Sequence, residues 1–111
     1  MIISIVPVHA SHSIHAFAAE GIVVIESTEE ISCNHNQVGI ILGKNRHHRK
    51  GWFMQGGLVN PGWRGKLTIE IKYNGEIQID QGDEVAQVII FEGEVSNLSE
   101  PCLILMGSQD T

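Results

Sequence analysis

Residues 66–73 alternate strictly between polar and apolar side chains, and this pattern constrains the fold more than any other feature of the chain. The run reads Lys66, Leu67, Thr68, Ile69, Glu70, Ile71, Lys72, Tyr73. Because successive side chains of a strand point to opposite faces, an alternation of period two predicts a half-buried β-strand. We therefore expect one face of this segment to pack on a core and the other to meet solvent.

Further strand signals run along most of the chain. Apolar and β-branched residues gather at 2–6, 21–26, 38–42, 52–54, 76–79, 84–92 and 102–106. The run at 84–92 is apolar on both faces, which predicts a buried central strand. Asn74-Gly75 predicts a hairpin turn before 76–79. Helix signals are poor, and only 12–20 is compatible with a short helix.

Short strands separated by Gly, Asn and Pro predict an all-β barrel or sandwich, and both Greek-key and jelly-roll versions are allowed. The 111 residues suffice for one small domain, which we expect to span 1–111. A β domain of this size with few charges often completes its core by oligomerising.

Charge and composition exclude several classes of function. The formal net charge of −6 disfavours general binding to nucleic acid or to an anionic membrane. No apolar run approaches the roughly 18 residues of a membrane-spanning helix. Cys33 and Cys102 form no CxxC pair and are too few for a disulfide framework, so a reduced cytoplasmic setting is expected. His9, His12 and His15, spaced i, i+3 and i+6, could bind a metal ion together if the segment were helical, and surface positions are the simpler expectation for them.

Two segments carry candidate chemistry. The run 44–50 holds four fixed cations and two histidines in an otherwise acidic chain, which favours either a phosphate site or a solvated loop. Residues 57–70 form a Gly-Pro turn with Asn60 at its apex, followed by the strand that carries Glu70. The simpler alternatives are that Asn60 only stabilises its turn and that Glu70 pairs with Lys66 or Lys72 on the exposed face.

Four motifs in order resemble the dUTPase and dCTP deaminase superfamily, and dCTP deaminase most closely. Residues 43–52 fall where the deaminases have Gly-[Arg/Lys]-Ser-Ser-x-x-Arg-x-Gly-Leu, and 57–65 match their Gly-[Phe/Val]-Ile-Asp-Pro-Gly-[Trp/Phe]-x-Gly turn. Residues 67–71 match Ile-Thr-Leu-Glu-Leu, and 82–91 match the strand that begins Gly-x-x-Ile-[Ala/Gly]-Gln. The resemblance covers about 24–93.

The resemblance implies a distorted jelly-roll domain, a homotrimer and pyrimidine deoxynucleotide sites at the subunit interfaces. In the deaminases a strand Glu and a motif Arg activate the water that attacks pyrimidine C4, and these roles fall on Glu70 and Arg49. A carboxylate beside a fixed guanidinium is a sensible proton shuttle. No cofactor is required by this chemistry, although Mg²⁺ would accompany a nucleoside triphosphate.

The resemblance also assigns the residues that contact the ligand. These are Lys44, Asn45, Arg46, Asn60, Trp63, Arg64 and Gln87. Asn45 and Arg46 stand where the family has serines, and Asn60 stands where dUTPases have the Asp that activates water. Since an amide cannot accept that proton, dUTP hydrolysis by the usual mechanism is not expected. The alternative is a catalytically inactive trimeric binding or regulatory module that keeps only the fold.

Overall fold

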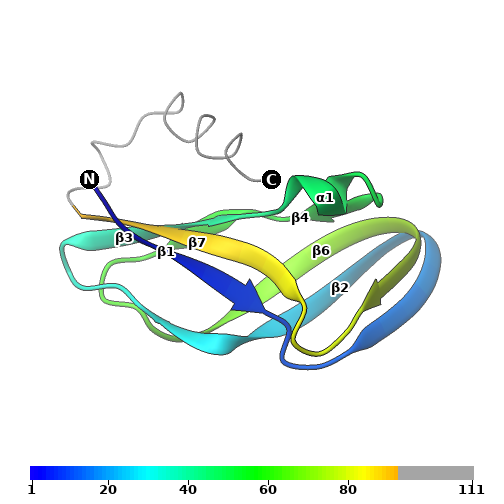
Figure 1. The fold of residues 1–111 in the computed structure, drawn as a ribbon, viewed down its shortest axis with the longest axis horizontal. Coiled ribbons are helices and arrows are strands. Elements are labelled where there is room, and N and C mark those ends of the chain that lie inside the picture. Colours follow the sequence, from blue (N-terminus) through cyan, green and yellow to red (C-terminus); the bar gives the residue numbers. More distant parts are fainter. Residues whose placement is uncertain (93–111) are drawn as a thin grey trace.

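The computed structural model describes residues 1–92, apart from the side chains of Asn45 and His48. The elements in this part are β1 (Ile2–His9), β2 (Ile14–Ser32), β3 (Gln37–Leu42), α1 (Asn45–His48), β4 (Trp52–Met54), β5 (Gly57–Val59), β6 (Arg64–Ile79) and β7 (Glu84–Glu92) (Figure 1). Apart from the four-residue helix α1, every regular element is a strand. The predicted all-β class is therefore confirmed.

The strands form two antiparallel sheets. One has the order β1-β7-β3-β5, and the other has the order β2-β6-β4. Figure 1 shows β1, β3 and β7 layered against β2 and β6. The chain crosses between the sheets in the turn from β5 to β6, since β5 pairs with β3 and β6 pairs with β2 and β4. This crossing positions the candidate site.

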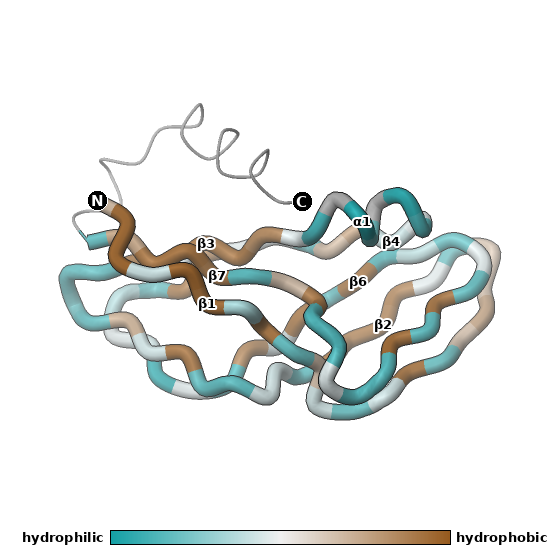
Figure 2. The backbone as a smooth tube through the Cα atoms, in the orientation of Figure 1, coloured by the Kyte–Doolittle hydropathy of each residue, from teal (hydrophilic) through white to brown (hydrophobic). Residues whose placement is uncertain are grey.

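The hydrophobic core lies between the two sheets. Its β6 contribution is the apolar set of the alternating run, Leu67, Ile69, Ile71 and Tyr73. The polar set of the same run is exposed, as period two predicted. β7 is an interior strand buried on both faces, because Val88 packs in this core while Ile89 and Phe91 pack in a second apolar cluster with β3. Figure 2 shows the apolar stretches of β1, β3 and β7 side by side.

Two expectations about local structure are wrong. Residues 12–20 do not form a helix, because residues 14–20 belong to β2 and residues 14–18 pair with the end of β6. The burial of this segment alternates with a period of two, since Ala16 and Ala18 are half-buried while Phe17 is exposed. The alanines hide this alternation in the sequence because they are small and weakly apolar. His9 ends β1, His12 lies between the strands and His15 lies in β2, so these three histidines share no helical face.

Asn74-Gly75 does not form a hairpin turn, since β6 continues through it to Ile79. Here β2 carries Ala19 and Glu20 between the pairs Ala18↔Gly75 and Gly21↔Tyr73, so two residues oppose Asn74. This is a β-bulge, and the positive φ of 85° at Gly75 fits its local geometry.

The predicted strand at 102–106 lies outside the described residues, as does Cys102. Within residues 1–92, the helical segment is too short and too polar to cross a membrane.

Candidate functional site

The turn at residues 60–63 is fixed by backbone hydrogen bonds. The N–H of Trp63 donates to the carbonyl of Asn60 at 3.1 Å, which closes the turn. The N–H of Gly62 donates to the carbonyl of Cys33 at 2.9 Å, and the N–H of Cys33 donates to the carbonyl of Trp63 at 2.9 Å. Gly62 has φ 83°, a conformation that favours glycine. The turn is therefore anchored to the chain just after β2, with the side chains of Asn60 and Trp63 exposed.

A hollow of about 270 Å³ opens beside this turn. It lies between β5 and β6 and is lined by Ile41, Leu58, Val59, Asn60, Trp63, Lys66, Leu67 and Thr68. On this side of β6, β4 pairs only with Ile71–Tyr73, and the N–H of Gln55 donates to the carbonyl of Glu70 at 2.8 Å. No described strand covers β6 at residues 66–69 on this side, so the hollow meets a free strand edge.

Glu70 projects from the exposed face of β6, directly opposite Val24 of β2. It follows Thr68 of the hollow by two residues, and same-face neighbours in a strand have Cα atoms roughly 7 Å apart. Among the described residues, its carboxylate makes no ion pair or side-chain hydrogen bond. The expected pairing with Lys66 or Lys72 is therefore not observed, and Lys66 lies 3.9 Å from Glu26 instead.

The basic run folds against β7. Nζ of Lys44 lies 3.1 Å from Oε2 of Glu84 and 3.5 Å from Oε1 of Gln87. An Nη atom of Arg46 lies 3.6 Å from the other oxygen of Glu84. The Lys44 side chain is mostly buried, whereas Arg49 is exposed in the turn after α1. The run is therefore neither a purely solvated loop nor an uncompensated cationic patch.

The predicted site residues fall into two groups within one chain. One group lies in the β5–β6 turn and along β6, and consists of Asn60, Trp63, Arg64 and Glu70. The other group lies around the start of β7, and consists of Lys44, Arg46 and Gln87. In residues 1–92, no hydrogen bond or ion pair joins Arg49 to Glu70. Asn45 lies in α1, but its side chain is outside the described part. One chain thus does not assemble the full predicted set.

Sequence reasoning missed two features of this region. The sequence pattern marks Glu84 only as the start of a strand, yet Glu84 partners both Lys44 and Arg46. The pattern marks Thr68 only as part of the polar face of its strand, yet Thr68 lines the hollow. Neither has a local sequence signal, because each depends on packing between segments distant in the chain.

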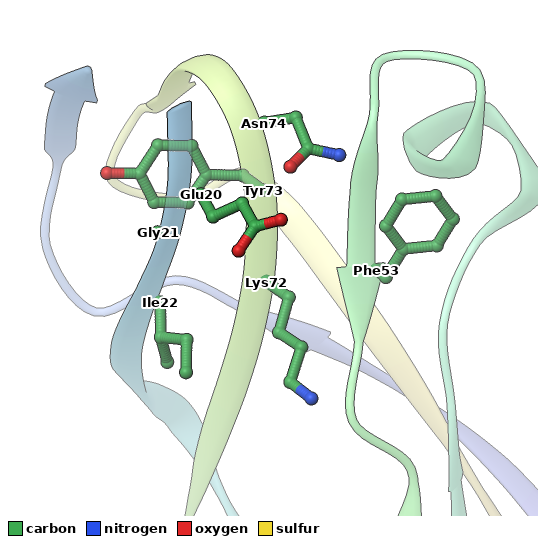
Figure 3. Close-up of a pocket in the computed structure, with 7 residues that line it drawn as sticks. All are labelled: Glu20, Gly21, Ile22, Phe53, Lys72, Tyr73 and Asn74. Carbon is green, nitrogen blue, oxygen red and sulfur yellow. The ribbon is translucent and has the colours of Figure 1, made fainter. Parts of the chain in front are cut away.

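A larger cavity of about 640 Å³ lies further along β6 (Figure 3). Its lining is Glu20, Gly21, Ile22, Phe53, Lys72, Tyr73 and Asn74. Glu70 therefore lies between Thr68 of the first hollow and Lys72 of the second, on the same face of β6.

The described residues hold no group of three His, Cys, Asp or Glu side chains arranged to bind a metal ion. Mg²⁺ commonly binds instead through substrate phosphates with few protein ligands.

The sequence of residues 8–93 matches the dCTP deaminase-like family. The chain belongs to this family. The match spans the β5–β6 turn, Glu70, the basic run and Gln87, so all the predicted site residues of this dCTP deaminase-like chain lie inside it. No curated protein matches the sequence.

Solved structures with the same fold include two staphylococcal phage dUTPases. A mutant dUTPase from phage phi11 of S. aureus, described for its coordination of a structural Mg(II) ion, superposes with a TM-score of 0.71 at 19% identity, covering 85% of this chain and 80% of that one. A mutant dUTPase of Staphylococcus bacteriophage 80alpha with dUpNHpp has a TM-score of 0.69 at 17% identity, covering 85% and 83%. The dCTP deaminase-like chain therefore has the dUTPase-like jelly-roll fold.

Proposed function

We propose that this dCTP deaminase-like chain binds a pyrimidine deoxynucleotide with the base in the hollow beside Asn60. The observation that carries the proposal is the uncovered edge of β6 at residues 66–69, next to a turn that presents Asn60 and Trp63. Free backbone N–H and C=O groups at a strand edge are directional partners for the polar edge of a base. The Asn60 amide both donates and accepts, and the Trp63 indole offers a flat apolar surface.

Glu70 is the residue that would act on the base. Its carboxylate has no partner among the described side chains, so it can accept a proton from water. The resulting hydroxide adds to C4 of cytosine, and ammonia leaves after it receives the proton. The sum is a dCTP-type nucleotide plus water giving the uracil nucleotide plus ammonia, with no net redox change.

Arg49 would reach Glu70 from a neighbouring chain, because the two side chains do not meet within one chain. We therefore propose a homotrimer whose interfaces complete the sites. Arg64 at the start of β6 and the cations Lys44 and Arg46 are the candidates for phosphate contacts. Mg²⁺, where present, would bind through those phosphates.

A second candidate is a nucleotide-binding module without turnover. Glu84 already neutralises two of the cations, at 3.1 Å from Lys44 and 3.6 Å from Arg46. In addition, Asn60 cannot serve as a general base, which argues against dUTP hydrolysis in both candidates.

The first test is thermal unfolding of the protein with dCTP, dUTP, dCMP, dUMP and dTTP, each with and without Mg²⁺. A ligand that binds only the native state raises Tm by mass action. We expect a rise with one pyrimidine nucleotide, and no rise with any of them contradicts the nucleotide proposal.

Ammonia release from the bound cytosine nucleotide then separates the two candidates. Glu70→Gln should abolish turnover while the Tm shift and the sedimentation coefficient stay unchanged. Glu26→Gln is the matched control, because it removes an exposed carboxylate from the same face of the sheet and should leave turnover intact. Binding without ammonia release in the wild type supports the module.

A further inference from the structure

β2 is an edge strand with a long unpaired side. It lies at the end of the order β2-β6-β4 and pairs with β6 on one side only. On its other side, the described residues contribute one isolated bridge, Ala10↔Ser27, and a hydrogen bond from the N–H of Ser11 to the carbonyl of Glu26. The backbone of residues 21–25 therefore presents N–H and C=O groups at a free edge, which is a template for another strand.

The free edge has only part of the usual protection against strand addition, namely flanking bulges and carboxylates. Natural edge strands often carry lysine or proline, but β2 contains neither. Its central segment reads Glu20-Gly21-Ile22-Val23-Val24-Ile25-Glu26, and Ile22 and Val24 are 58% and 53% exposed. We propose that residues 21–25 pair with an extended peptide, which joins the sheet as a further strand. This peptide has a β-branched centre and, at each end, a basic residue whose side chain reaches Glu20 or Glu26.

The charges on the outer face define the partner. Glu20, Ile22, Val24 and Glu26 are all exposed at alternate positions. Figure 3 shows Glu20 and Ile22 on the same side of the sheet as Lys72. Because directly opposed side chains interact across a strand pair, the complementary strand has a basic residue, two β-branched residues and a second basic residue at alternate positions. A lysine side chain is long enough to reach either carboxylate.

Neither carboxylate is strongly engaged within the chain. Glu20 makes no ion pair or side-chain hydrogen bond with the described residues. Glu26 lies 3.9 Å from Nζ of Lys66, with both side chains about half exposed, and such surface pairs contribute little. Both are therefore available to a basic partner.

A second copy of the chain fits this edge poorly in the register that aligns the two apolar centres. Antiparallel pairing of two β2 strands about Val23 sets Glu20 opposite Glu26 at both ends. Like charges directly opposed across a strand pair are destabilising. Charge complementarity thus favours a basic peptide over self-association.

This edge and the proposed nucleotide site lie on opposite sides of β6 and touch only through the exposed pair Glu26–Lys66, because Lys66 lines the hollow. β2 flanks β6 on one side, whereas the hollow beside Asn60 opens on the other side. Peptide binding is therefore expected with or without nucleotide, and its failure leaves the nucleotide proposal untouched.

The test uses a fluorescein-labelled peptide of sequence Lys-Thr-Val-Thr-Val-Thr-Lys and a control with Glu at both ends. Fluorescence anisotropy with the full chain should show saturable binding of the basic peptide and at least tenfold weaker binding of the acidic one. Hydrogen exchange followed by NMR should show new protection of the Ile22 and Val24 amides, because alternate residues of a strand direct their N–H groups to the same edge and the Glu26 carbonyl already faces this one. Two further basic peptides carry backbone N-methyl groups, each at a different set of alternate residues. Only the peptide whose methylated N–H groups face β2 should lose binding.

The double variant Glu20→Lys/Glu26→Lys should reverse the preference between the two peptides, while the matched variant Glu30→Lys/Glu92→Lys should not. Three outcomes overturn the proposal: no binding of the basic peptide, binding without protection of the Ile22 and Val24 amides, or an unchanged preference in the double variant. Concentration-dependent dimerisation that the double variant alters would assign the edge to a second copy and overturn it too.

Discussion

The backbone N–H of His9 donates a 2.8 Å hydrogen bond to Oε1 of Glu29, while Nδ1 of the same histidine lies 2.5 Å from Oε2. One carboxylate thus holds both the backbone and the ring of His9. Since His9 ends β1 and Glu29 lies in the bulge of β2, the pair joins one sheet to the other. Partial burial raises the pKa of Glu29, but the hydrogen bonds from His9 and from its own backbone outweigh this and leave the pKa below 4.5.

The lowered pKa of Glu29 predicts a loss of stability in acid. A carboxyl whose native pKa lies below its unfolded value stabilises the fold above the unfolded pKa, and this contribution disappears as the pH falls through the native pKa. Glu29→Gln should lower the free energy of unfolding by roughly 1–2 kcal/mol at pH 7, since hydrogen bonds to charged groups are involved and the site is partly exposed. The difference in the free energy of unfolding between wild type and Glu29→Gln should shrink as the pH falls below about 4.5.

Urea unfolding of wild type and Glu29→Gln between pH 7 and pH 3 measures this difference. Glu30→Gln is the matched control, because Glu30 is exposed and has no partner among the described side chains. A difference that is the same at both ends of this pH range would contradict a role for ionised Glu29.

Ser27 replaces a missing strand pairing at the same bulge. Its side chain is fully buried, and its Oγ accepts the N–H of Leu67 at 2.8 Å and donates to the carbonyl of Glu29 at 2.8 Å. Ser27→Ala leaves a buried N–H without a partner and should cost about 1–3 kcal/mol in chemical denaturation. Ser13→Ala removes an exposed acceptor of the Gln81 N–H, which water can replace, and should cost much less. Equal losses would show that burial does not set the cost.

Local pattern predicted much of the fold. The alternation at 66–73 gave the buried and exposed faces of β6 correctly, and the predicted strands at 52–54 and 84–92 match β4 and β7. The predictions from sequence fail where pairing between distant segments determines the secondary structure. Residues 14–18 look weakly helical by composition, but they become a strand because residues 75–79 of β6 provide a partner for them.

The candidate site was less accessible from sequence for the same reason. The motif order located Asn60 and Glu70, and the structure adds that both border an uncovered strand edge. The ion pair between Lys44 and Glu84 joins residues far apart in the chain, so no spacing rule reveals it. The separation of Arg49 from Glu70 within one chain likewise depends on the path of β4 between them.

The ring of Tyr73 leaves no room for a side chain at position 21, which is Gly21. A Cβ atom at Gly21 would lie 2.4 Å from Cε1 of the tyrosine, whose side chain is buried. Gly21→Ala should therefore lower the free energy of unfolding by about 1–3 kcal/mol through overpacking. Gly57→Ala is the control, because nothing lies within 4 Å of its Cβ position. Adding Tyr73→Leu should recover part of the Gly21→Ala loss, and a simple sum of the two single losses would refute the clash.

Glu84 is predicted to restrain phosphate binding by the basic run. Its two oxygens lie 3.1 Å from Nζ of Lys44 and 3.6 Å from an Nη atom of Arg46, so one carboxylate competes with any phosphate for both cations. Glu84→Gln keeps the side-chain size and removes the charge. The Kd for a pyrimidine nucleoside triphosphate, measured by calorimetry at low salt, should fall several-fold, because the Glu84 carboxylate then no longer competes with phosphate for these two cations. The affinity for the corresponding monophosphate should rise less, since it offers fewer charged oxygens.

Asp80→Asn removes a nearby exposed carboxylate that contacts neither cation and serves as the control. A Kd that does not change in Glu84→Gln, while nucleotide still binds, would place the phosphates away from Lys44 and Arg46 and leave Arg64 and Arg49 as the cations to test.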